Sequence, residues 1–256
     1  MITSDMPNSA GAPNETEPTT VGMRPTSRRY SMIFAIALTV VTLVALIVAF
    51  LSSDFRQRGS SALPSGWTQT YNADLTSTDD GQWDETQGCD INALGLDANA
   101  TGNSDAQCAF RPSVQGNVTS AGFYFVTQLA PAAKVPSFAR SIVSVGALGD
   151  INAPAGSVVH FIVGQDGSYT LCDGVCSQGV SSIYLHGGLA SWHGDALVAN
   201  TIAVKVTPDH STLTVFVNDQ EVATVTPQLG PQPVIAVGAP ADSEAIFTHA
   251  TLYTGQ

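Results

Sequence analysis

The sequence predicts an all-β sandwich or jelly roll that follows a single transmembrane helix. Residues 32–51 contain no charged residue and are rich in Val, Ile, Leu, Ala and Phe. Beyond residue 66 the chain shows many short runs of alternating apolar and polar residues, separated by turn sequences. No window after residue 52 keeps a 3.6-residue period, so strands are expected throughout the C-terminal body.

The chain begins with a polar tail, residues 1–30, rich in Pro, Thr, Ser, Asn and Gly. Such a segment buries too little apolar surface to offset chain entropy, so we expect it to be disordered. Residues 31–52 follow, and a helix of about 20 residues at ~1.5 Å per residue spans the ~30 Å apolar core of a bilayer. The lipid bilayer is therefore an expected partner.

Two other interpretations of the apolar segment are less favoured. A cleaved signal peptide has a shorter apolar core near the N-terminus and a small-x-small site, whereas thirty residues precede this segment. A buried helix of a soluble protein rarely extends this far without a polar face. We therefore expect an uncleaved anchor, followed by a short flexible stalk at residues 53–65.

Charge and cysteine positions predict the orientation of this anchor. Arg24, Arg28 and Arg29 precede it and Arg56 and Arg58 follow it, which slightly favours a cytoplasmic N-terminus. All four cysteines lie beyond the anchor, and an even number confined to one side predicts disulfides in an oxidising compartment. The expected location is the cell membrane, with a single pass and with residues 66–256 forming one extracytoplasmic domain.

The C-terminal domain is strongly acidic. Residues 66–256 contain four Lys or Arg residues against seventeen Asp or Glu residues, a formal charge of −13. Nucleic acids and anionic lipids need a basic surface, so neither is an expected ligand of this domain.

Ten strands are expected in the domain. In residues 201–206, Ile202, Val204 and Val206 share one face and should point inward, whereas Lys205 should point outward. Val215 and Val217 should face the same core from a neighbouring strand, and Asn218-Asp219 should form the next turn. The expected strands are residues 123–129, 141–147, 157–163, 168–172, 181–186, 201–206, 212–217, 221–226, 234–237 and 245–253.

Three segments resemble the concanavalin A-like, or laminin-G-like, jelly-roll family. They are residues 160–171 (HFIVGQDGSYTL), 200–206 (NTIAVKV) and 213–225 (LTVFVNDQEVATV). The resemblance covers about residues 120–256, with Asp219 where the family usually has Gly. It implies a jelly-roll sandwich. It does not decide the function, because this architecture includes lectins, glycosidases and plain interaction modules.

Four cysteines allow three pairings, of which we expect the local one. Cys172 and Cys176 flank a tight turn, and Cys89 and Cys108 could close the loop between them. A zinc site is the alternative, but it would normally show Cys-x2-Cys pairs or neighbouring histidines.

No catalytic residue is expected. Retaining glycosidases of this fold usually present Glu-x-Asp-x-x-Glu on one strand, and Glu85, Glu221 and Glu244 do not form that pattern. There is also no Gly-x-Ser-x-Gly nucleophile elbow.

The segment around Trp192 is the candidate ligand site. His186, Trp192, His193 and Asp195 lie in a Gly-rich connection, where an aromatic ring could stack on a sugar while polar neighbours bind its hydroxyl groups. The alternative is that Trp192 only packs beneath the loop. No third ligand accompanies the two histidines, so a metal site is not expected here.

Acidic residues crowd around Trp83 and could bind calcium through their oxygens. Their spacing is not that of an EF-hand, and a solvated acidic loop is the favoured interpretation, so we expect no cofactor. These residues are Asp79, Asp80, Asp84, Glu85 and Asp90.

Taken together, the sequence predicts a membrane-anchored recognition module that binds glycan or a surface protein without catalysis. Two alternatives stay open: a glycan-processing enzyme similar to glycoside hydrolases, and a structural accessory subunit of an envelope complex.

Overall fold

The computed structural model describes residues 66–76, 81–84, 88–111, 121–134, 139–148, 157–174, 176 and 183–255. The predicted tail (1–30), transmembrane helix (31–52) and stalk (53–65) lie outside the described residues. Within the described ranges, no helix has the length and apolar character needed to span a bilayer.

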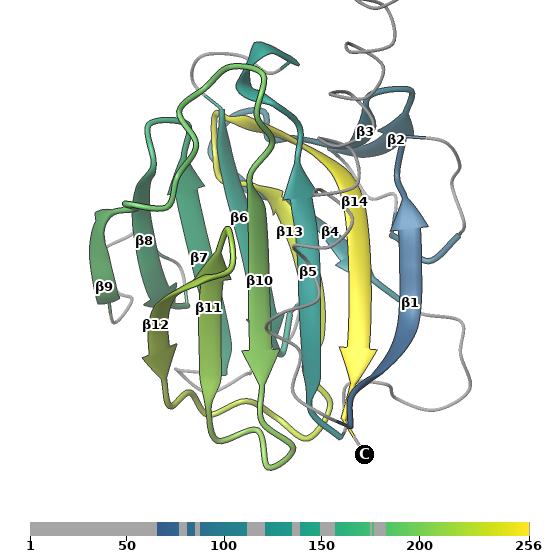
Figure 1. Cartoon of the computed structure of the whole chain (residues 1–256), viewed down its shortest axis with the longest axis vertical. Coiled ribbons are helices and arrows are strands. Elements are labelled where there is room, and N and C mark those ends of the chain that lie inside the picture. Colours follow the sequence, from purple (N-terminus) through teal and green to yellow (C-terminus); the bar gives the residue numbers. More distant parts are fainter. Residues whose placement is uncertain are drawn as a thin grey trace, which may run out of the picture. The chain divides into compact units, whose positions relative to one another are not determined.

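The described strands form two antiparallel sheets packed face to face (Figure 1). The larger sheet has eight strands in the order β12-β11-β10-β5-β14-β3-β2, and β1 pairs with β14 beside β3. Its strands are β1 (Thr68–Asp74), β2 (Cys89–Asn92), β3 (Gly95–Asn99), β5 (Phe123–Leu129), β10 (Thr201–Val206), β11 (Leu213–Val217), β12 (Gln220–Val225) and β14 (Glu244–Thr254).

The smaller sheet has six strands in the order β4-β13-β6-β7-β8-β9. Three consecutive hairpins build β6 to β9, and β13 returns from the far end of the chain to pair with β4 and β6. Its strands are β4 (Ala106–Phe110), β6 (Arg140–Gly146), β7 (Val158–Gly164), β8 (Ser168–Asp173), β9 (Ile183–Gly188) and β13 (Val234–Ala239). This arrangement confirms the predicted all-β sandwich.

The core lies between the sheets, and the predicted register of β10 is confirmed. Ile202, Val204 and Val206 are buried, and Val204 lies opposite Phe125 of β5 and Val215 of β11. Lys205, on the other face of the strand, is only partly buried. Alternation along β10 therefore identified the core face correctly.

The ten expected strands are all present in the described residues, and their ends differ from the expected ones by at most two positions. Strands β1 to β4 were not expected, nor was the short 3-10 helix η2 (Ala132–Lys134). The sequences of β2 (CDIN) and β3 (GLDAN) are short and contain Gly, Asp and Asn, which are depleted in strands. Pairing with β14 stabilises β3 across a long sequence separation, which no local pattern reveals.

The turn between β11 and β12 has the predicted backbone conformation. Asn218 and Asp219 have φ values of 49° and 65°, as a two-residue hairpin turn requires. The sequence Asn-Asp therefore adopts the left-handed conformation at a position where the family usually has Gly.

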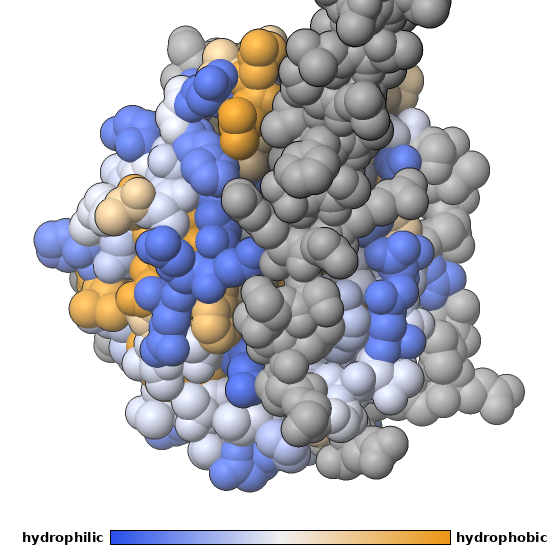
Figure 2. Space-filling view, in the orientation of Figure 1, coloured by the Kyte–Doolittle hydropathy of each residue, from blue (hydrophilic) through white to orange (hydrophobic). Residues whose placement is uncertain are grey.

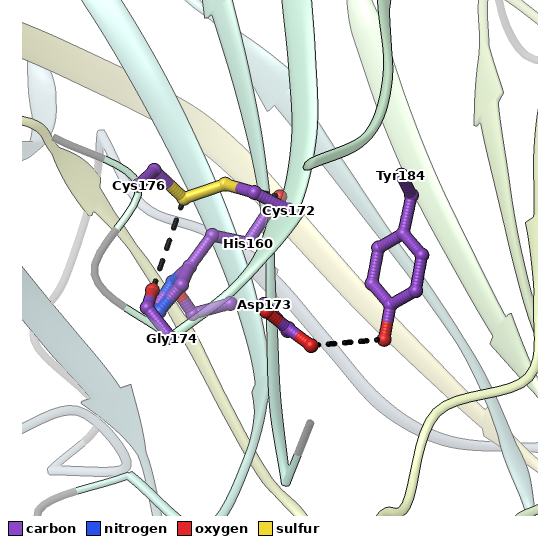
Figure 3. The surroundings of a disulfide bond; sticks show 7 residues. His160, Cys172, Asp173, Gly174, Cys176 and Tyr184 are labelled. Atoms are coloured by element: carbon purple, nitrogen blue, oxygen red, sulfur yellow. Dashed lines mark hydrogen bonds between the residues drawn. A yellow bond between two sulfur atoms is a disulfide. The ribbon is translucent and has the colours of Figure 1, made fainter. Parts of the chain in front are cut away.

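Both predicted disulfides are confirmed. Cys89 and Cys108 have Cα atoms 5.7 Å apart, and Cys172 and Cys176 have Cα atoms 5.9 Å apart. The first bond does more than close a loop, because it joins β2 of the larger sheet to β4 of the smaller sheet. The second closes the turn after β8, beside the hydrogen bond from Tyr184 Oη to Asp173 Oδ2 (Figure 3).

Trp83, in the described part of the acidic segment, packs against β4, whereas Asp90 is exposed, as the prediction of solvated acidic residues expects. The Trp83 ring is only 5% exposed, contacts Phe110 and donates its indole N–H to Tyr71 Oη at 3.0 Å. Asp84 forms an ion pair with Arg111 at 2.5 Å. Asp79, Asp80 and Glu85 lie outside the described residues. Among the residues that are described, no three His, Cys, Asp or Glu side chains group to hold a metal ion.

Hydrophobic residues reach the surface at one margin of the sandwich. Figure 2 shows them at the left of the view, where Figure 1 places β9 and β12. Ile183 and Leu185 of the edge strand β9 are among the exposed large hydrophobic residues.

Candidate functional site

A cleft lies at one end of the sandwich, between the two sheets. It contains about 420 Å³ of space, counted with the solvent at its open side. The end of β5 and the starts of β10 and β14 border it from the larger sheet, and the start of β6 and the end of β7 from the smaller sheet (Figure 1). Its lining residues include Leu129, Ala130, Ala139, Arg140, Gln165, Trp192, His193, Asn200, Glu244, Ala245 and Ile246.

Trp192 lies in the connection between β9 and β10 and is half-buried. Its indole N–H donates to the backbone carbonyl of Gln165 at 2.9 Å, so the single polar atom of the ring is already paired. Trp192 lines the cleft and also packs against the hydrophobic core, as the alternative interpretation of this residue expects. The ring also packs on Gly167, which has a φ of 78°. A Cβ at residue 167 would lie 2.9 Å from Trp192 Cγ, so glycine permits both the turn and this contact.

His193 follows Trp192 and is held through its backbone. The His193 N–H donates to Asn200 Oδ1 at 2.8 Å, and Asn200 Nδ2 donates back to the His193 carbonyl at 3.1 Å. The buried Asn200 therefore clamps this point of the loop, while the imidazole of His193 stays exposed.

Asn218 extends this hydrogen-bond network to the β11–β12 turn. Its Nδ2 donates to the Ser191 carbonyl at 2.6 Å and to Asn200 Oδ1 at 2.8 Å. Its Oδ1 accepts the backbone N–H of Thr201 at 2.8 Å. Two asparagines thus fix the loop that carries Trp192 and His193, and we expect the geometry of this wall of the cleft to be rigid.

Two charged residues are among those that line the cleft, one from each sheet. Arg140 begins β6 and is exposed, and Glu244 begins β14 and is half-buried. Burial raises the pKa of Glu244, and the nearby carboxylate of Asp97 raises it further. Among the described residues, neither side chain takes part in a hydrogen bond or an ion pair.

The remaining wall of the cleft is apolar and is built largely from small side chains. Ala130 follows β5, Ala139 precedes β6, and Ala245 lies at the start of β14; all three are buried. Leu129 and Ile246 complete this wall. Alanine at these positions leaves space that a larger side chain would fill.

The structure brings together only part of the predicted site. Trp192 and His193 line the cleft, whereas His186 and Asp195 do not. His186 lies exposed on β9 opposite Thr170. Asp195 accepts the Leu197 N–H at 2.9 Å and so stabilises its own turn.

Sequence reasoning did not place five polar lining residues in the site, namely Arg140, Ser141, Gln165, Asn200 and Glu244. It considered Glu244 only as a catalytic carboxylate. Apart from Arg140 and Ser141, these residues are distant in sequence, and they share no motif, so no local signal could have grouped them.

A buried Ser–His pair lies away from the cleft, in the smaller sheet. Ser144 Oγ and His160 Nδ1 are 2.7 Å apart, and burial lowers the pKa of His160. Such a pair resembles half of a hydrolytic triad. Ser144, however, is 0% exposed and could not meet a substrate in this conformation. We therefore assign the pair a structural role.

No known family model matches the chain, and no curated protein sequence matches it. Solved structures do share its fold. The metal-free carbohydrate recognition domain of Emp46p is 11% identical, with a TM-score of 0.52, over 74% of this chain and 99% of that one. A β-glucanase of Bacillus licheniformis is 13% identical, with a TM-score of 0.48, over 76% and 100%.

The κ-carrageenase of Pseudoalteromonas carrageenovora is 10% identical, with a TM-score of 0.46, over 76% of this chain and 98% of that one. The similarity to the Emp46p domain shows that the described residues adopt the concanavalin-like jelly-roll fold. At these identities the similarity concerns the fold alone.

Proposed function

We propose that this chain is a membrane-anchored recognition module that binds glycan, without catalysis, in the cleft beside Trp192. The observation that carries the proposal is the composition of the cleft. A half-buried indole with its N–H paired lines the same cleft as Arg140, Asn200 and Glu244. A sugar presents an apolar ring face and several hydroxyl groups, and this combination of groups can bind both.

The fold supports the same proposal at a coarser level. Carbohydrate recognition domains and glycosidases occur among the solved structures that share it. Ligand sites of such sandwiches lie on connections that a rigid scaffold holds in place, as the two asparagines hold the Trp192 loop here.

Binding of glycan is tested with the full-length chain in a detergent without a sugar headgroup. Trp192→Ala should weaken binding to the best glycan of a panel about 10-fold or more, since removing a stacking ring typically costs ~1–3 kcal/mol. The matched control is Trp67→Ala, because Trp67 packs near Gly255 at the opposite end of the sandwich and should leave affinity unchanged. Equal affinities of wild type and Trp192→Ala would refute the assigned site, and no binding to any glycan would refute the function.

The anchor and the orientation are part of the proposal. They rest on the uncharged segment 32–51 and on four cysteines that all follow it, which form the two disulfides. A membrane-impermeant thiol reagent applied to intact cells should label the protein only after reduction. Labelling without reductant would contradict extracytoplasmic disulfides, and no labelling after reduction would contradict the orientation.

Glycoside hydrolysis is the second candidate, and one observation favours it. The raised pKa of Glu244 is a property of catalytic acids. Hydrolysis needs a pair of carboxylates about 5–9.5 Å apart, and Glu244 is the single carboxylate among the described lining residues. We therefore expect no turnover. Product release that Glu244→Gln abolishes would reverse this assignment.

A further inference from the structure

We propose that the edge strand β9 is a docking site for an extended, positively charged segment of a partner protein, which pairs with it as a further strand of the smaller sheet. The proposal is independent of glycan binding, because none of residues 183–188 lines the cleft beside Trp192. Three features of β9 support it: an outer edge without a strand partner, exposed apolar side chains, and a flanking stretch of chain that contains Asp but no Lys or Arg.

β9 is the last strand of the smaller sheet, and among the described residues no strand pairs with its outer edge. Five of its six residues are exposed and the sixth is partly buried, so this edge is open to solvent. Unpaired N–H and C=O groups along such an edge fit the backbone of another extended chain. A β-bulge at Tyr184 interrupts the pairing with β8, but residues 185–188 pair regularly and present a regular edge.

The other described edges of the sandwich carry features that oppose strand addition. A bridge between Trp83 and Phe110 covers the edge strand β4. Each of the edge strands β1, β2 and β12 contains an exposed acidic residue, namely Asp74, Asp90 and Glu221. Charged side chains and covering segments are the usual protection of a free edge. The sequence of β9, IYLHGG, contains no charged residue and no Pro, so this edge lacks such protection.

The apolar side chains of β9 are exposed at the margin of the core. Ile183 is 56% exposed and Leu185 is 43% exposed. Leu185 lies opposite Leu171, a fully buried core residue, so it continues the apolar layer of the core beyond β8. An apolar side chain of an added strand could cover Leu185, and both would gain from leaving water. This margin is part of the hydrophobic surface seen in Figure 2.

Gly188, at the end of β9, is not required by the fold itself. A Cβ at this position would meet nothing within 4 Å, and its φ lies outside the left-handed region that favours glycine. A glycine in a strand leaves room for another backbone to approach closely. Its place on an open edge therefore agrees with the addition of a strand.

Charge indicates the kind of segment that docks. Residues 141–204, which include β7, β8 and β9, contain no Lys or Arg. Asp166 precedes β8 and Asp173 ends it, so an acidic residue lies near each end of the strand beside β9. Arg140 acts on Asp166, but it begins β6, three strands from β9.

These carboxylates favour a cationic partner. An added strand would lie two strand spacings of ~4.8 Å from β8, which is close to the Debye length of ~8 Å at physiological ionic strength. Lys or Arg in that strand would be attracted and acidic residues repelled. A second copy of this chain would present the same acidic stretch without a cation, so it is a poor partner for β9.

The test uses three synthetic peptides, each acetylated and amidated at its ends. The first is KKTVTVTVKK, the second has Glu in place of every Lys, and the third is the first with N-methyl groups on two adjacent central residues. Adjacent residues donate towards opposite edges of a strand, so these groups remove one donor from each edge. Fluorescence anisotropy with the full-length chain in a zwitterionic detergent should show that the first peptide binds about 10-fold more tightly than the other two. Salt at about 1 M, where the Debye length is ~3 Å, should reduce its advantage over the Glu peptide.

Two variants locate the binding. Leu185→Lys should weaken binding of the first peptide about 10-fold, because it adds a cation to the edge and removes an apolar contact. The matched control is Gln220→Lys, which adds the same charge at an exposed position of β12 and should change the affinity little. Thermal melting confirms that both variants are folded. In the wild type, the first peptide should protect the amides of residues 183–188 from hydrogen exchange.

The proposal is wrong if none of the peptides binds, if the Glu or the N-methylated peptide binds as tightly as the first, or if the protected amides lie outside β9. Equal affinities of Leu185→Lys and Gln220→Lys would also overturn it. Analytical ultracentrifugation of the chain alone tests the other occupant, since a dimer that Leu185→Lys dissociates would assign this edge to a second copy. Glycan affinity in the same preparations reports on the cleft separately, so failure of one proposal leaves the other intact.

Discussion

The side chain of Asn218 links the hairpin turn to the loop of the candidate site, and replacing it should separate two contributions to stability. In the native protein it donates to the Ser191 carbonyl and Asn200 Oδ1 and accepts from the Thr201 N–H. Its backbone has a φ of 49°, which glycine adopts freely and alanine does not.

The structure gives the size of each effect. Asn218→Gly keeps the turn but removes three hydrogen bonds of 2.6–2.8 Å and a longer, weaker one of 3.3 Å from Thr201 Oγ1. At about 1 kcal/mol for each of the three shorter bonds, the free energy of unfolding should fall by about 3 kcal/mol. Asn218→Ala removes the same bonds and adds ~1–2 kcal/mol for the left-handed conformation. For a domain of this size, a loss of 3 kcal/mol lowers the melting temperature by roughly 6–12 °C.

Urea unfolding, followed by circular dichroism, measures these differences. The matched control is Asp242→Gly, because Asp242 has a φ of 55° but its exposed side chain makes no hydrogen bond to the described residues. This control should be as stable as the wild type or slightly more stable. The reasoning fails if Asn218→Gly matches that control, or if the alanine variant is more stable than the glycine variant.

Two further predictions concern the core and the acid range. Val204→Asp places an unpaired carboxylate at a site that is 2% exposed and should lower the free energy of unfolding by at least ~3 kcal/mol. Lys205→Asp, on the opposite face, should lower it by less than ~1 kcal/mol. Equal decreases for the two variants in urea unfolding would show that the predicted register is wrong. Hydrogen bonds from Thr207 and Ser211 lower the pKa of Asp209 from 3.8 to about 2, so its stabilising contribution is present above pH 3.8 and is lost as the pH falls towards 2. Asp209→Asn should flatten this part of the stability–pH curve, and an unchanged curve would contradict the assignment.

Local patterns in the sequence were sufficient for much of the sandwich. Alternation placed Val204 in the core and Lys205 outside it. The pair Asn218-Asp219 was recognised as a turn. Cysteine spacing led to the correct disulfides because each pair is close in the chain, at separations of 19 and 4 residues.

The same patterns failed where the evidence was not local. The segment around Trp83 was expected to be a solvated acidic loop, and no pattern in it predicted that the Trp83 ring packs against Phe110. Asp84 is acidic in the sequence and yet is paired with Arg111. Burial of Trp83 depends on β1 and β4, and neither strand has a sequence pattern that predicts it.

The sequence by itself determined the class of fold, the core face of β10, the turn at Asn218 and the cysteine pairs, because each depends on neighbours along the chain. Only the tertiary structure decided which residues meet in the cleft. Arg140 and Glu244 begin strands of different sheets. Trp192 lies between these two residues in the sequence, on the connection from β9 to β10. Sheet pairing and packing bring these groups together across long sequence separations, and no periodicity records contacts of that kind.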